Sequence, residues 1–316
     1  MTGESSFISA LRAIASDPAA RGLIDDAAVL EVGGKSLVLT HDMIVEGVHF
    51  LSGDPAADVA WKLVAVNISD LAAKGASPLG LLLGYSLTRT SDWNEAFLVG
   101  LGEAVRAFEA PLLGGDTVAA PPGAPRSLGL TAIGEAARPI PCRAGAKAGD
   151  ALWVSGSIGD AGAGLRIAIG ELHGDPALLA RYRRPQPRLA LGRELAPMTS
   201  AMMDVSDGLL IDAARMAEAS RLAVHVDLGR LPLSEALVAA VGDTRASRLD
   251  AAIAGDDYEL LFALPPSEDR SLGAISASLA LPLTRIGHFE AGAGLHLAWQ
   301  GAAVPLPPRL GYEHTV

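Results

Sequence analysis

The sequence predicts a two-domain α+β protein, and three observations support this fold class. Its 316 residues exceed the usual size of a single domain. Strand and helix patterns mix in both halves without a regular strand–helix–strand alternation, which favours helices on one face of a mixed sheet. Residues 136–150 are rich in proline, glycine and charge, as linkers are, and the pattern restarts after them. We therefore expect one domain over residues 1–142 and a second α/β domain over residues 143–316.

Hydrophobic periodicity places the elements in order. The stretch 37–50 has the β-branched and apolar residues of a strand. The next helix is expected to follow Asp54, which can cap it, with Pro55 in its first turn and Gly75 at its end. The rest of the first half is expected to form a helix at 91–110 and strands at 79–87, 111–118 and 127–136. The second half is expected to form helices at 160–169, 187–196 and 207–220, and strands at 150–156, 200–205, 222–228, 258–264, 283–290 and 294–299.

Composition and charge exclude several classes of protein. The net charge of −11 argues against a general nucleic-acid binder, which would present a basic face. Cys142 is the only cysteine, which excludes an internal disulfide and a zinc site with several thiolates. The longest apolar runs fall short of the roughly 18–20 residues of a membrane span, and no basic segment followed by an apolar run opens the chain. We expect a cytoplasmic protein that contacts neither nucleic acid nor membrane.

Two glycine-rich segments resemble phosphate-binding loops only in part. Residues 32–36, "VGGKS", end like a Walker A loop, but Val29 stands where that motif needs a glycine, and a strand follows instead of a helix. Residues 156–164, "GSIGDAGAG", precede an expected helix, so their amides could bind a phosphate. They do not match the dinucleotide-binding pattern, and a tight turn with close packing is the favoured interpretation.

Aspartates recur at the ends of expected strands and on one expected helix. They are Asp25 and Asp26 before a strand, Asp42 at a strand end, Asp70 on a mostly apolar helix face, Asp116 after two glycines, and Asp204 and Asp207 in "DVSDG". Each alone fits a turn, a cap or a solvated carboxylate. Together they place several carboxylates beside apolar segments, where an unpaired charge costs several kcal/mol. Lys74, four residues after Asp70, is the only obvious local cation.

Divalent cations would compensate this excess of negative charge. The chain has no H-x-x-x-H or H-E-x-x-H motif and no aspartate-rich calcium loop. Oxygen ligands without thiolates or paired histidines favour Mg²⁺. Because Mg²⁺ held by carboxylates usually bridges to phosphoryl oxygens, the sequence predicts a site for a phosphate-containing substrate.

Several segments, spread over nearly the whole chain, resemble the thiamine-monophosphate kinase family in their order and spacing. They are "IDDAAVL", "THDMIVEGVHF", "KLVAVNISDLAAKGASP", "LLGGDTV", "CRAGAKAGD", "DVSDGLLID", "AGDDYELLF" and "LGYEH". The combination of "EGVHF", "VNISDLAA" and "DYELLF" is highly specific. This family belongs to the aminoimidazole-ribonucleotide synthetase superfamily, whose members have a dimerising N-terminal α/β domain and a second α/β domain, and bind ATP without a Walker A loop.

The resemblance implies ATP-dependent phosphorylation of thiamine monophosphate to thiamine diphosphate, the last step of thiamine diphosphate biosynthesis, by a Mg²⁺-dependent homodimer. The implied metal ligands are Asp26, Thr40, His41, Asp42, Asp70, Asp116, Asp204 and Asp207. The implied nucleotide contacts are Gly115, Asp116, Arg143 and Ser206, and the implied substrate contacts are His49, Asp256 and Tyr312. The acceptor is itself a phosphate with a second pKa of about 6, so its oxygen needs no general base. We therefore expect direct in-line transfer without a catalytic base or a phosphoenzyme.

The sequence departs from the family pattern at several of these positions. Ile24 replaces a glycine before the paired aspartates, and His41 replaces a threonine. Lys74 adds a cation to the helix of Asp70, and the loop after Asp116 lacks an arginine. Asp256 replaces a glutamate, which shortens a substrate-contacting carboxylate by one methylene. All core aspartates are present, and these changes bear on substrate preference.

Alternatives remain for single residues and for the function. His49 and Tyr312 fit packing roles, Arg143 fits a linker salt bridge, and Ser206 or Asp207 could cap the following helix. Asp212, five residues beyond Asp207, is interpreted as structural. The alternative activities are an ATP-dependent synthetase of the same superfamily and a non-catalytic nucleotide- or thiamine-binding protein. The lack of an N-terminal catalytic cysteine and of a cysteine-bearing C-terminal tail argues against selenophosphate synthesis and hydrogenase maturation.

Overall fold

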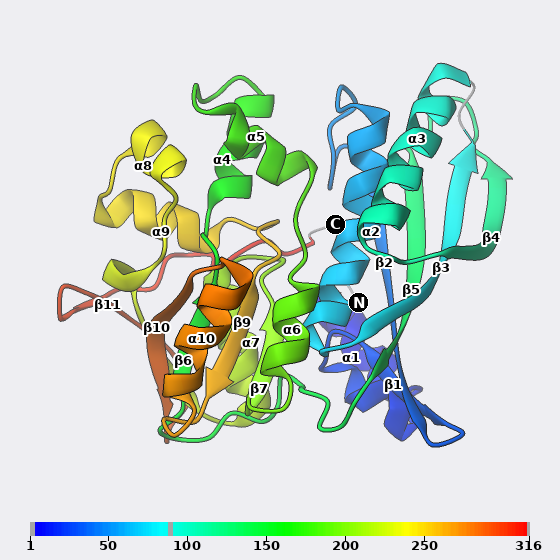
Figure 1. The fold of residues 1–316 in the computed structure, drawn as a ribbon. Coiled ribbons are helices and arrows are strands. Elements are labelled where there is room, and N and C mark those ends of the chain that lie inside the picture. The colour runs from blue at the N-terminus through cyan, green and yellow to red at the C-terminus, as the bar shows by residue number, and fades with distance from the viewer. Residues whose placement is uncertain (1–3, 88–90, 315–316) are drawn as a thin grey trace.

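Two sheets lie side by side in the computed structural model, which describes residues 4–87 and 91–314 (Figure 1). The first sheet has the strand order β1-β2-β5-β3-β4 and is antiparallel except for the β3–β4 pair. Its strands are β1 (Ala28–Val32), β2 (Lys35–Val45), β3 (Ser77–Leu87), β4 (Leu112–Ala119) and β5 (Ser127–Ala136). The helices of this half are α1 (Glu4–Arg12), the 3₁₀ helix η1 (Pro18–Leu23), α2 (Ala56–Ala73) and α3 (Ser91–Ala107).

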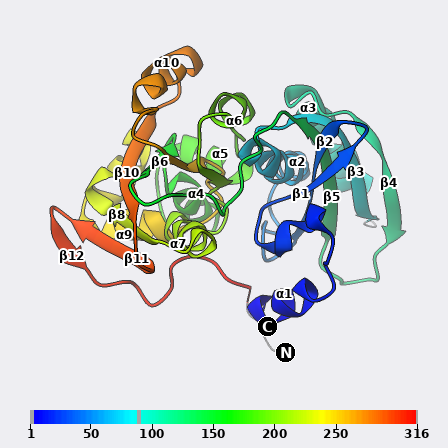
Figure 2. The same cartoon turned by 90° about the horizontal axis from the view of Figure 1, so that it is seen from below.

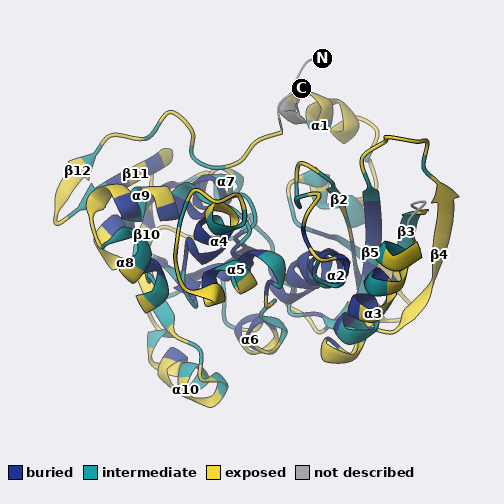
Figure 3. Cartoon of the chain, turned by 90° about the horizontal axis from the view of Figure 1, so that it is seen from above, coloured by how far each residue is buried: buried dark blue, intermediate teal, exposed yellow. Residues whose placement is uncertain are grey.

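Helices cover only one face of the first sheet. α2 packs on β2 and β5, and α3 packs on α2. Strand residues that face these helices, such as Val38, Ile44 and Leu81, are buried. Met43 and Leu82 point to the other face and are exposed, and the edge strand β4 is exposed along its length (Figure 3). Because side chains alternate between faces along a strand, the sheet presents one open face with apolar side chains.

α2 is buried almost all round and lies between the two sheets (Figure 3). A helix in this position is expected to have apolar residues on every side, yet α2 also buries Lys62 and Asp70. It ends at Ala73, and Gly75, two residues later, adopts a φ of +63° that a glycine tolerates best. The prediction that Asp54 caps α2 is wrong. Its carboxylate accepts the N–H of Leu51 and hydrogen bonds from the second domain, so Pro55 precedes the helix without a side-chain cap.

The second sheet has the strand order β12-β11-β8-β10-β6-β9-β7. Its strands are β6 (Ala151–Ser155), β7 (Ala201–Asp204), β8 (Ala223–Asp227), β9 (Leu260–Leu264), β10 (Leu283–Glu290), β11 (Gly294–Trp299) and β12 (Ala302–Val304). The helices are α4 (Asp160–Ala168), α5 (Pro176–Arg183), α6 (Leu189–Leu195), α7 (Leu209–Ser220), the 3₁₀ helix η2 (Leu228–Arg230), α8 (Glu235–Val241), α9 (Arg245–Ile253) and α10 (Asp269–Leu279). Mixed sheets with helices in both halves confirm the predicted α+β class.

The two faces of the second sheet are covered differently. On one face, α7 contributes Leu210 and Met216 to a core shared with β6, β8 and β9. On the other face, α6 and α10 pack with the last turn of α2 over β7 and β9, around Phe262 and Leu264. Beyond these two helices, β8, β10 and β11 carry partly or fully exposed histidines on this second face.

Several short elements were not predicted: α1, α5, α8, α9, α10 and β12. α8 and α9 have seven and nine residues, too few for a clear periodic signal. Side-chain caps mark their starts, because Ser234 and Thr244 accept the N–H groups of Leu237 and Ser247. The strand expected over 37–50 also ends early, at Val45, because residues 46–50 turn back.

Residues 137–150 connect the two sheets without a helix or a strand. The expected domain boundary between residues 142 and 143 lies in this segment. The glycine-containing segment 32–36 joins β1 and β2 as a hairpin, with φ of +58° and +82° at Gly33 and Gly34. Within residues 4–87 and 91–314, no helix has the length and apolar character needed to cross a membrane.

Candidate active site

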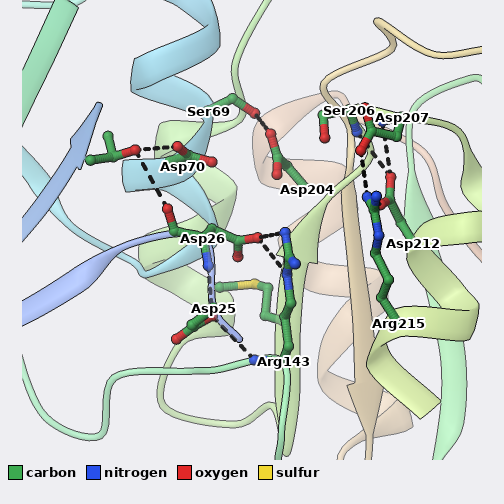
Figure 4. A network of polar contacts seen from close by, with 12 residues as sticks. Asp25, Asp26, Ser69, Asp70, Arg143, Asp204, Ser206, Asp207, Asp212 and Arg215 are labelled. Atoms are coloured by element: carbon green, nitrogen blue, oxygen red, sulfur yellow. Dashed lines mark hydrogen bonds and ion pairs between the residues drawn. The ribbon is translucent and has the colours of Figure 1, made fainter. Parts of the chain in front are cut away.

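Three aspartates with buried carboxylates converge between the domains. Asp26 precedes β1, Asp70 lies on α2, and Asp204 ends β7 (Figure 4). One carboxylate oxygen from each lies within 4.8 Å of the other two. Carboxylates this close repel one another when ionised, so hydrogen bonds or cations must compensate their negative charge. The hydrogen bonds and ion pairs of each aspartate show how much of this compensation the chain supplies.

Asp70 and Asp204 each receive a hydroxyl hydrogen bond. Thr40 Oγ1 donates to Oδ2 of Asp70, and Ser69 Oγ donates to Oδ2 of Asp204 across 2.5 Å. Within residues 4–87 and 91–314, no lysine or arginine lies within ion-pair distance of either carboxylate. Neutral donors compensate a buried charge only partly, so ionising either carboxyl group leaves a negative charge without a partner cation.

Burial raises the pKa values of these carboxyl groups, and neighbouring carboxylates add to the shift. Burial, followed by the negative charge of Asp26, raises the pKa of Asp204 to about 8. Burial, followed by the charges of Asp42 and Asp204, holds the pKa of Asp70 well above its ordinary value. Burial also raises the pKa of the partly exposed Asp42 to about 6. The site therefore favours protonation of these groups, or cation binding, near neutral pH.

Asp26 differs because two cations contact it. Arg143 Nε donates to its Oδ1 across 2.7 Å, and a second guanidinium nitrogen lies 2.5 Å from the same atom. Lys74 Nζ lies 2.6 Å from Oδ2 but outside hydrogen-bond geometry, so this buried oxygen has no hydrogen-bond partner among the described residues. Burial is the largest influence and raises the pKa of Asp26, but Arg143 and Lys74 outweigh it, and the pKa is lowered.

Lys74 does not pair with Asp70, which corrects the prediction from sequence spacing. Its ammonium group contacts Asp25 and Asp26 and donates to the carbonyl of Met202. The side chain is fully buried, and the two carboxylates outweigh burial and raise its pKa. Lys74 follows the last turn of α2, so it reaches the segment before β1 and not the α2 face that carries Asp70.

The donor set of this cluster fits a hard divalent cation. The buried carboxylates, including Oδ2 of Asp26, which accepts no hydrogen bond, and the Thr40 hydroxyl offer oxygen ligands without a thiolate or imidazole. Mg²⁺ prefers such ligands, and its charge would compensate the excess negative charge on Asp70 and Asp204.

A cleft of about 640 Å³ lies between the end of β2 and the second domain, and Asp42, whose charge acts on Asp70, lines it. Its lining includes the predicted site residues Asp42, His49, Ser206, Asp207, Asp256 and Tyr312. The partly buried His49 is fixed because its Nδ1 accepts the N–H of Val45 across 3.1 Å. Burial, followed by the charge of His314, lowers the pKa of His49, so the ring is held neutral.

Asp256 lies at a strained corner of this cleft. Its φ is +71°, and Tyr258 follows at +50°, values that non-glycine residues adopt at an energetic cost. Lys62 Nζ lies 2.7 Å from Oδ2 of Asp256 and also donates to the carbonyl of His49. Tyr258 donates its hydroxyl to Oδ1 of Asp256. Lys62 therefore connects His49 of the first domain with Asp256 of the second.

The loop that carries Ser206 and Asp207 is held by Asp212. Oδ2 of Asp212 accepts the N–H groups of Ser206 and Asp207 at 3.1 and 3.2 Å, and Arg215 pairs with Asp207 and Asp212 (Figure 4). This agrees with the structural role interpreted for Asp212. The prediction that Ser206 or Asp207 caps the helix is wrong, because α7 starts after Gly208 without a side-chain cap.

Comparisons with known proteins identify the family. Residues 24–136 match the model of the AIR synthase related protein, N-terminal domain, and residues 147–300 match that of the C-terminal domain. A thiamine-monophosphate kinase of Caulobacter vibrioides is 42% identical over 306 residues, which cover 94% of this chain and 86% of the relative. One of Salmonella typhimurium is 37% identical, covering 93% and 91%. The chain belongs to the thiamine-monophosphate kinase family.

A solved structure agrees with this assignment over the whole fold. AaThiL complexed with AMPPCP and TMP superimposes with a TM-score of 0.85 at 30% identity, covering 99% of this chain and 97% of that one. The predicted resemblance to the thiamine-monophosphate kinase family is therefore confirmed.

Two of the metal ligands implied by the thiamine-monophosphate kinase motifs, His41 and Asp116, lie apart from the aspartate cluster. His41 follows Thr40 on β2, so its ring points to the open face of the first sheet, where Nδ1 lies 2.9 Å from Thr131 Oγ1. Asp116 is exposed on β4, next to Gly115, and the register places it in one row with Gly84, Gly129 and Met43. Three strand spacings, about 14 Å, separate Asp116 from β2.

The loop at 156–164 has a partner for its amides within the chain. Asp257, which is buried, accepts the N–H groups of Gly159 at 2.7 Å and Ala161 at 3.4 Å. A Cβ on Gly159 would lie 2.4 Å from that of Ala251. The glycines therefore serve a tight turn and close packing, and a carboxylate already occupies the place where a phosphate could bind.

The sequence did not single out Lys62, Ser69 or Tyr258, although all three side chains contact residues of the candidate site. Lys62 is 2% exposed and stands alone in the apolar stretch "AWKLVAV" of α2. A charged residue inside such a helix signals a buried ion pair. Ser69 carries no comparable signal, because its role depends on Asp204, 135 residues away.

Proposed function

We propose that the chain transfers the γ-phosphoryl group of ATP to thiamine monophosphate, forming thiamine diphosphate and ADP. The observation that carries this proposal is the buried cluster of Asp26, Asp70 and Asp204, whose electrostatic neighbour Asp42 lines the cleft. Asp70 and Asp204 have no partner lysine or arginine among the described residues, so they are suited to holding the cations that neutralise polyphosphate substrates. The similarity to thiamine-monophosphate kinases and to AaThiL complexed with AMPPCP and TMP supports this choice of substrates.

In the proposed reaction, an oxygen of the thiamine monophosphate phosphate forms a bond to the γ-phosphorus of ATP. The bond from this phosphorus to the bridging oxygen breaks, and its electron pair leaves on ADP. The attacking phosphate is mostly dianionic near neutral pH, so no side chain has to remove a proton. The chain's task is to position two polyanions, and His49, Asp256 and Tyr312 line the cleft on the proposed substrate side.

The proposed Mg²⁺ ligands are the oxygen donors at this end of the cleft: Asp26, Thr40, Asp42, Asp70, Asp204 and Asp207. When bound there, Mg²⁺ would neutralise phosphate charge during transfer. The proposed nucleotide contacts are Ser206 and Arg143, with Gly115 and Asp116 carried over from the family. Arg143 is ion-paired with Asp26, so its proposed role requires exchanging this carboxylate for a phosphate.

We further propose that the open face of the first sheet forms the interface of a homodimer. The exposed apolar residues Leu30, Val32, Met43, Leu82 and Val118 share this face. Such a patch is expected to be covered by a partner. His41 and Asp116 also lie on this face, so dimerisation would decide their surroundings. Sedimentation of Met43→Lys/Leu82→Lys as a monomer, with the unsubstituted chain as a dimer, would support this proposal, and a monomeric unsubstituted chain would refute it.

The deciding experiment is an assay that follows thiamine diphosphate directly, with ATP, thiamine monophosphate and Mg²⁺. We expect product with Mg²⁺ and none with EDTA. ADP release driven by a formylglycinamidine substrate, without thiamine diphosphate, would favour the alternative synthetase. Nucleotide binding without turnover of any candidate would favour a binding protein. The cytoplasm, where ATP is abundant, is the proposed location.

A further inference from the structure

Three histidines form a row across neighbouring strands of the second sheet, away from the cleft. His225 on β8 is in register with His288 on β10 and with His296 on β11. The ring of His225 stacks on both neighbours, with centroids 4.8 Å from His288 and 4.6 Å from His296. β8, β10 and β11 lie on the side of the second domain that is distant from α2 (Figure 2). The row is therefore separate from the aspartate cluster.

A carboxylate completes a set of converging ligand atoms. Nε2 of His225 lies 2.6 Å from Oε1 of Glu290. One nitrogen each of His225 and His288 and one oxygen of Glu290 all lie within 4.8 Å of one another. In a tetrahedral zinc site with bonds of about 2.0–2.1 Å, ligand atoms are about 3.3 Å apart. The rings of His225 and His288 are nearly parallel, at 8°, so binding one ion requires a rotation of the exposed His288, with Glu290 also exposed.

The surroundings leave space for a further ligand. A hollow of about 390 Å³ is lined by His225 and His288, together with Asp227, Arg230 and Arg285. Three protein ligands and one open position filled by water are typical of accessible zinc sites. If His225 and Glu290 formed only an ion pair, neither the nearby nitrogen of His288 nor the hollow beside it would be required.

We propose that His225, His288 and Glu290 form a surface site for a divalent transition-metal ion of the zinc class, with His296 supporting the ring stack. Imidazole nitrogens favour Zn²⁺ and its neighbours in the transition series, whereas Mg²⁺ prefers the all-oxygen aspartate cluster. The chain thus has two cation sites of different chemistry, and this one does not depend on the proposed phosphoryl transfer.

Cobalt titration of the full chain tests this site, because tetrahedral Co²⁺ absorbs visible light. The titration is done with saturating Mg²⁺, which occupies the aspartate cluster. We expect the unsubstituted chain to bind one Co²⁺, displaced by Zn²⁺, and His225→Gln/His288→Gln to lose at least about 10-fold in affinity. Glu290→Gln should weaken binding as well. The control His173→Gln, on an exposed histidine outside the row, should bind as the unsubstituted chain does.

Three results would overturn the proposal. They are no Co²⁺ or Zn²⁺ binding at micromolar concentrations, equal affinity in His225→Gln/His288→Gln and the unsubstituted chain, and loss of the cobalt spectrum in Asp204→Asn. The last result would assign the ion to the cleft. Thermal melting of each variant without metal checks folding, and the phosphoryl-transfer assay should give the same rate for all histidine variants.

Discussion

Replacing Asp204 with asparagine should change how the stability of the metal-free protein depends on pH. The pKa of Asp204 is raised to about 8 in the folded chain, whereas an unfolded aspartate has its ordinary value of 3.8. Between these values the folded state holds a proton that the unfolded state has released. The free energy of unfolding therefore falls as the pH rises through this window, with the full contribution present only at lower pH.

The size of this effect follows from the linkage of one proton. A difference of one bound proton changes the free energy of unfolding by about 1.4 kcal/mol per pH unit, so about 3 kcal/mol between pH 5 and 7 is the upper limit for Asp204. At about 2 °C per kcal/mol, this corresponds to roughly 5 °C in Tm. Asp26 does not add to the pH dependence of the free energy of unfolding. Its lowered pKa leaves it ionised in both the folded and the unfolded chain above pH 5.

Melting curves of the chain and of Asp204→Asn, recorded in EDTA from pH 5 to 8, measure this difference. The asparagine stays neutral, and it can still accept the hydrogen bond from Ser69. We expect a shallower slope for the variant and a higher Tm than the unsubstituted chain at pH 8. Mg²⁺ should raise the Tm of the unsubstituted chain more than that of the variant. Asp250→Asn, on an exposed aspartate, is the control.

The reasoning is refuted if Asp204→Asn and the unsubstituted chain show the same slope in EDTA. It is also refuted if Asp204→Asn is the less stable of the two at every pH. Either result would mean that Asp204 is ionised and well compensated in the metal-free fold.

Three further predictions concern turnover, substrate binding and packing. Asp207→Asn should lower kcat about 100-fold or more. It should shift Tm by less than about 2 °C, because the Asp207 carboxylate is partly exposed. Equal loss of stability and activity would favour a structural role. Lys62→Met and Asp256→Asn should each raise KM for thiamine monophosphate about 10-fold with less change for ATP, since they form one ion pair at the cleft; an effect confined to ATP would contradict this placement. Gly192→Ala should destabilise the chain by about 1–3 kcal/mol, because its Cβ would lie 2.0 Å from the Ala72 carbonyl oxygen. Gly273→Ala, with open space around a helical glycine, should instead stabilise it by roughly 0.5–1 kcal/mol in urea unfolding.

The longer elements and the family were accessible from the sequence because their signals are local. β2 alternates between buried and more exposed residues, α2 is a long, mostly apolar stretch, and Gly75 marks the end of α2. Short helices such as α8 lack enough turns for a periodic pattern. Cap predictions failed where a residue near the helix start had a tertiary partner, as Asp54 has in Tyr182 and Arg183.

The sequence by itself determined the α+β class, the family and the set of aspartates available for cation binding. It could not determine which carboxylates meet, because strand pairing and domain packing join residues far apart in the chain. Tertiary structure placed Asp204 against Ser69, directed Lys74 to Asp25 and Asp26, and turned His41 away from the cluster. It also aligned three histidines whose positions in the chain give no metal-binding spacing. The physical reason is that a one-residue step along a strand reverses the face of a side chain, and only the packed fold decides what lies on each face.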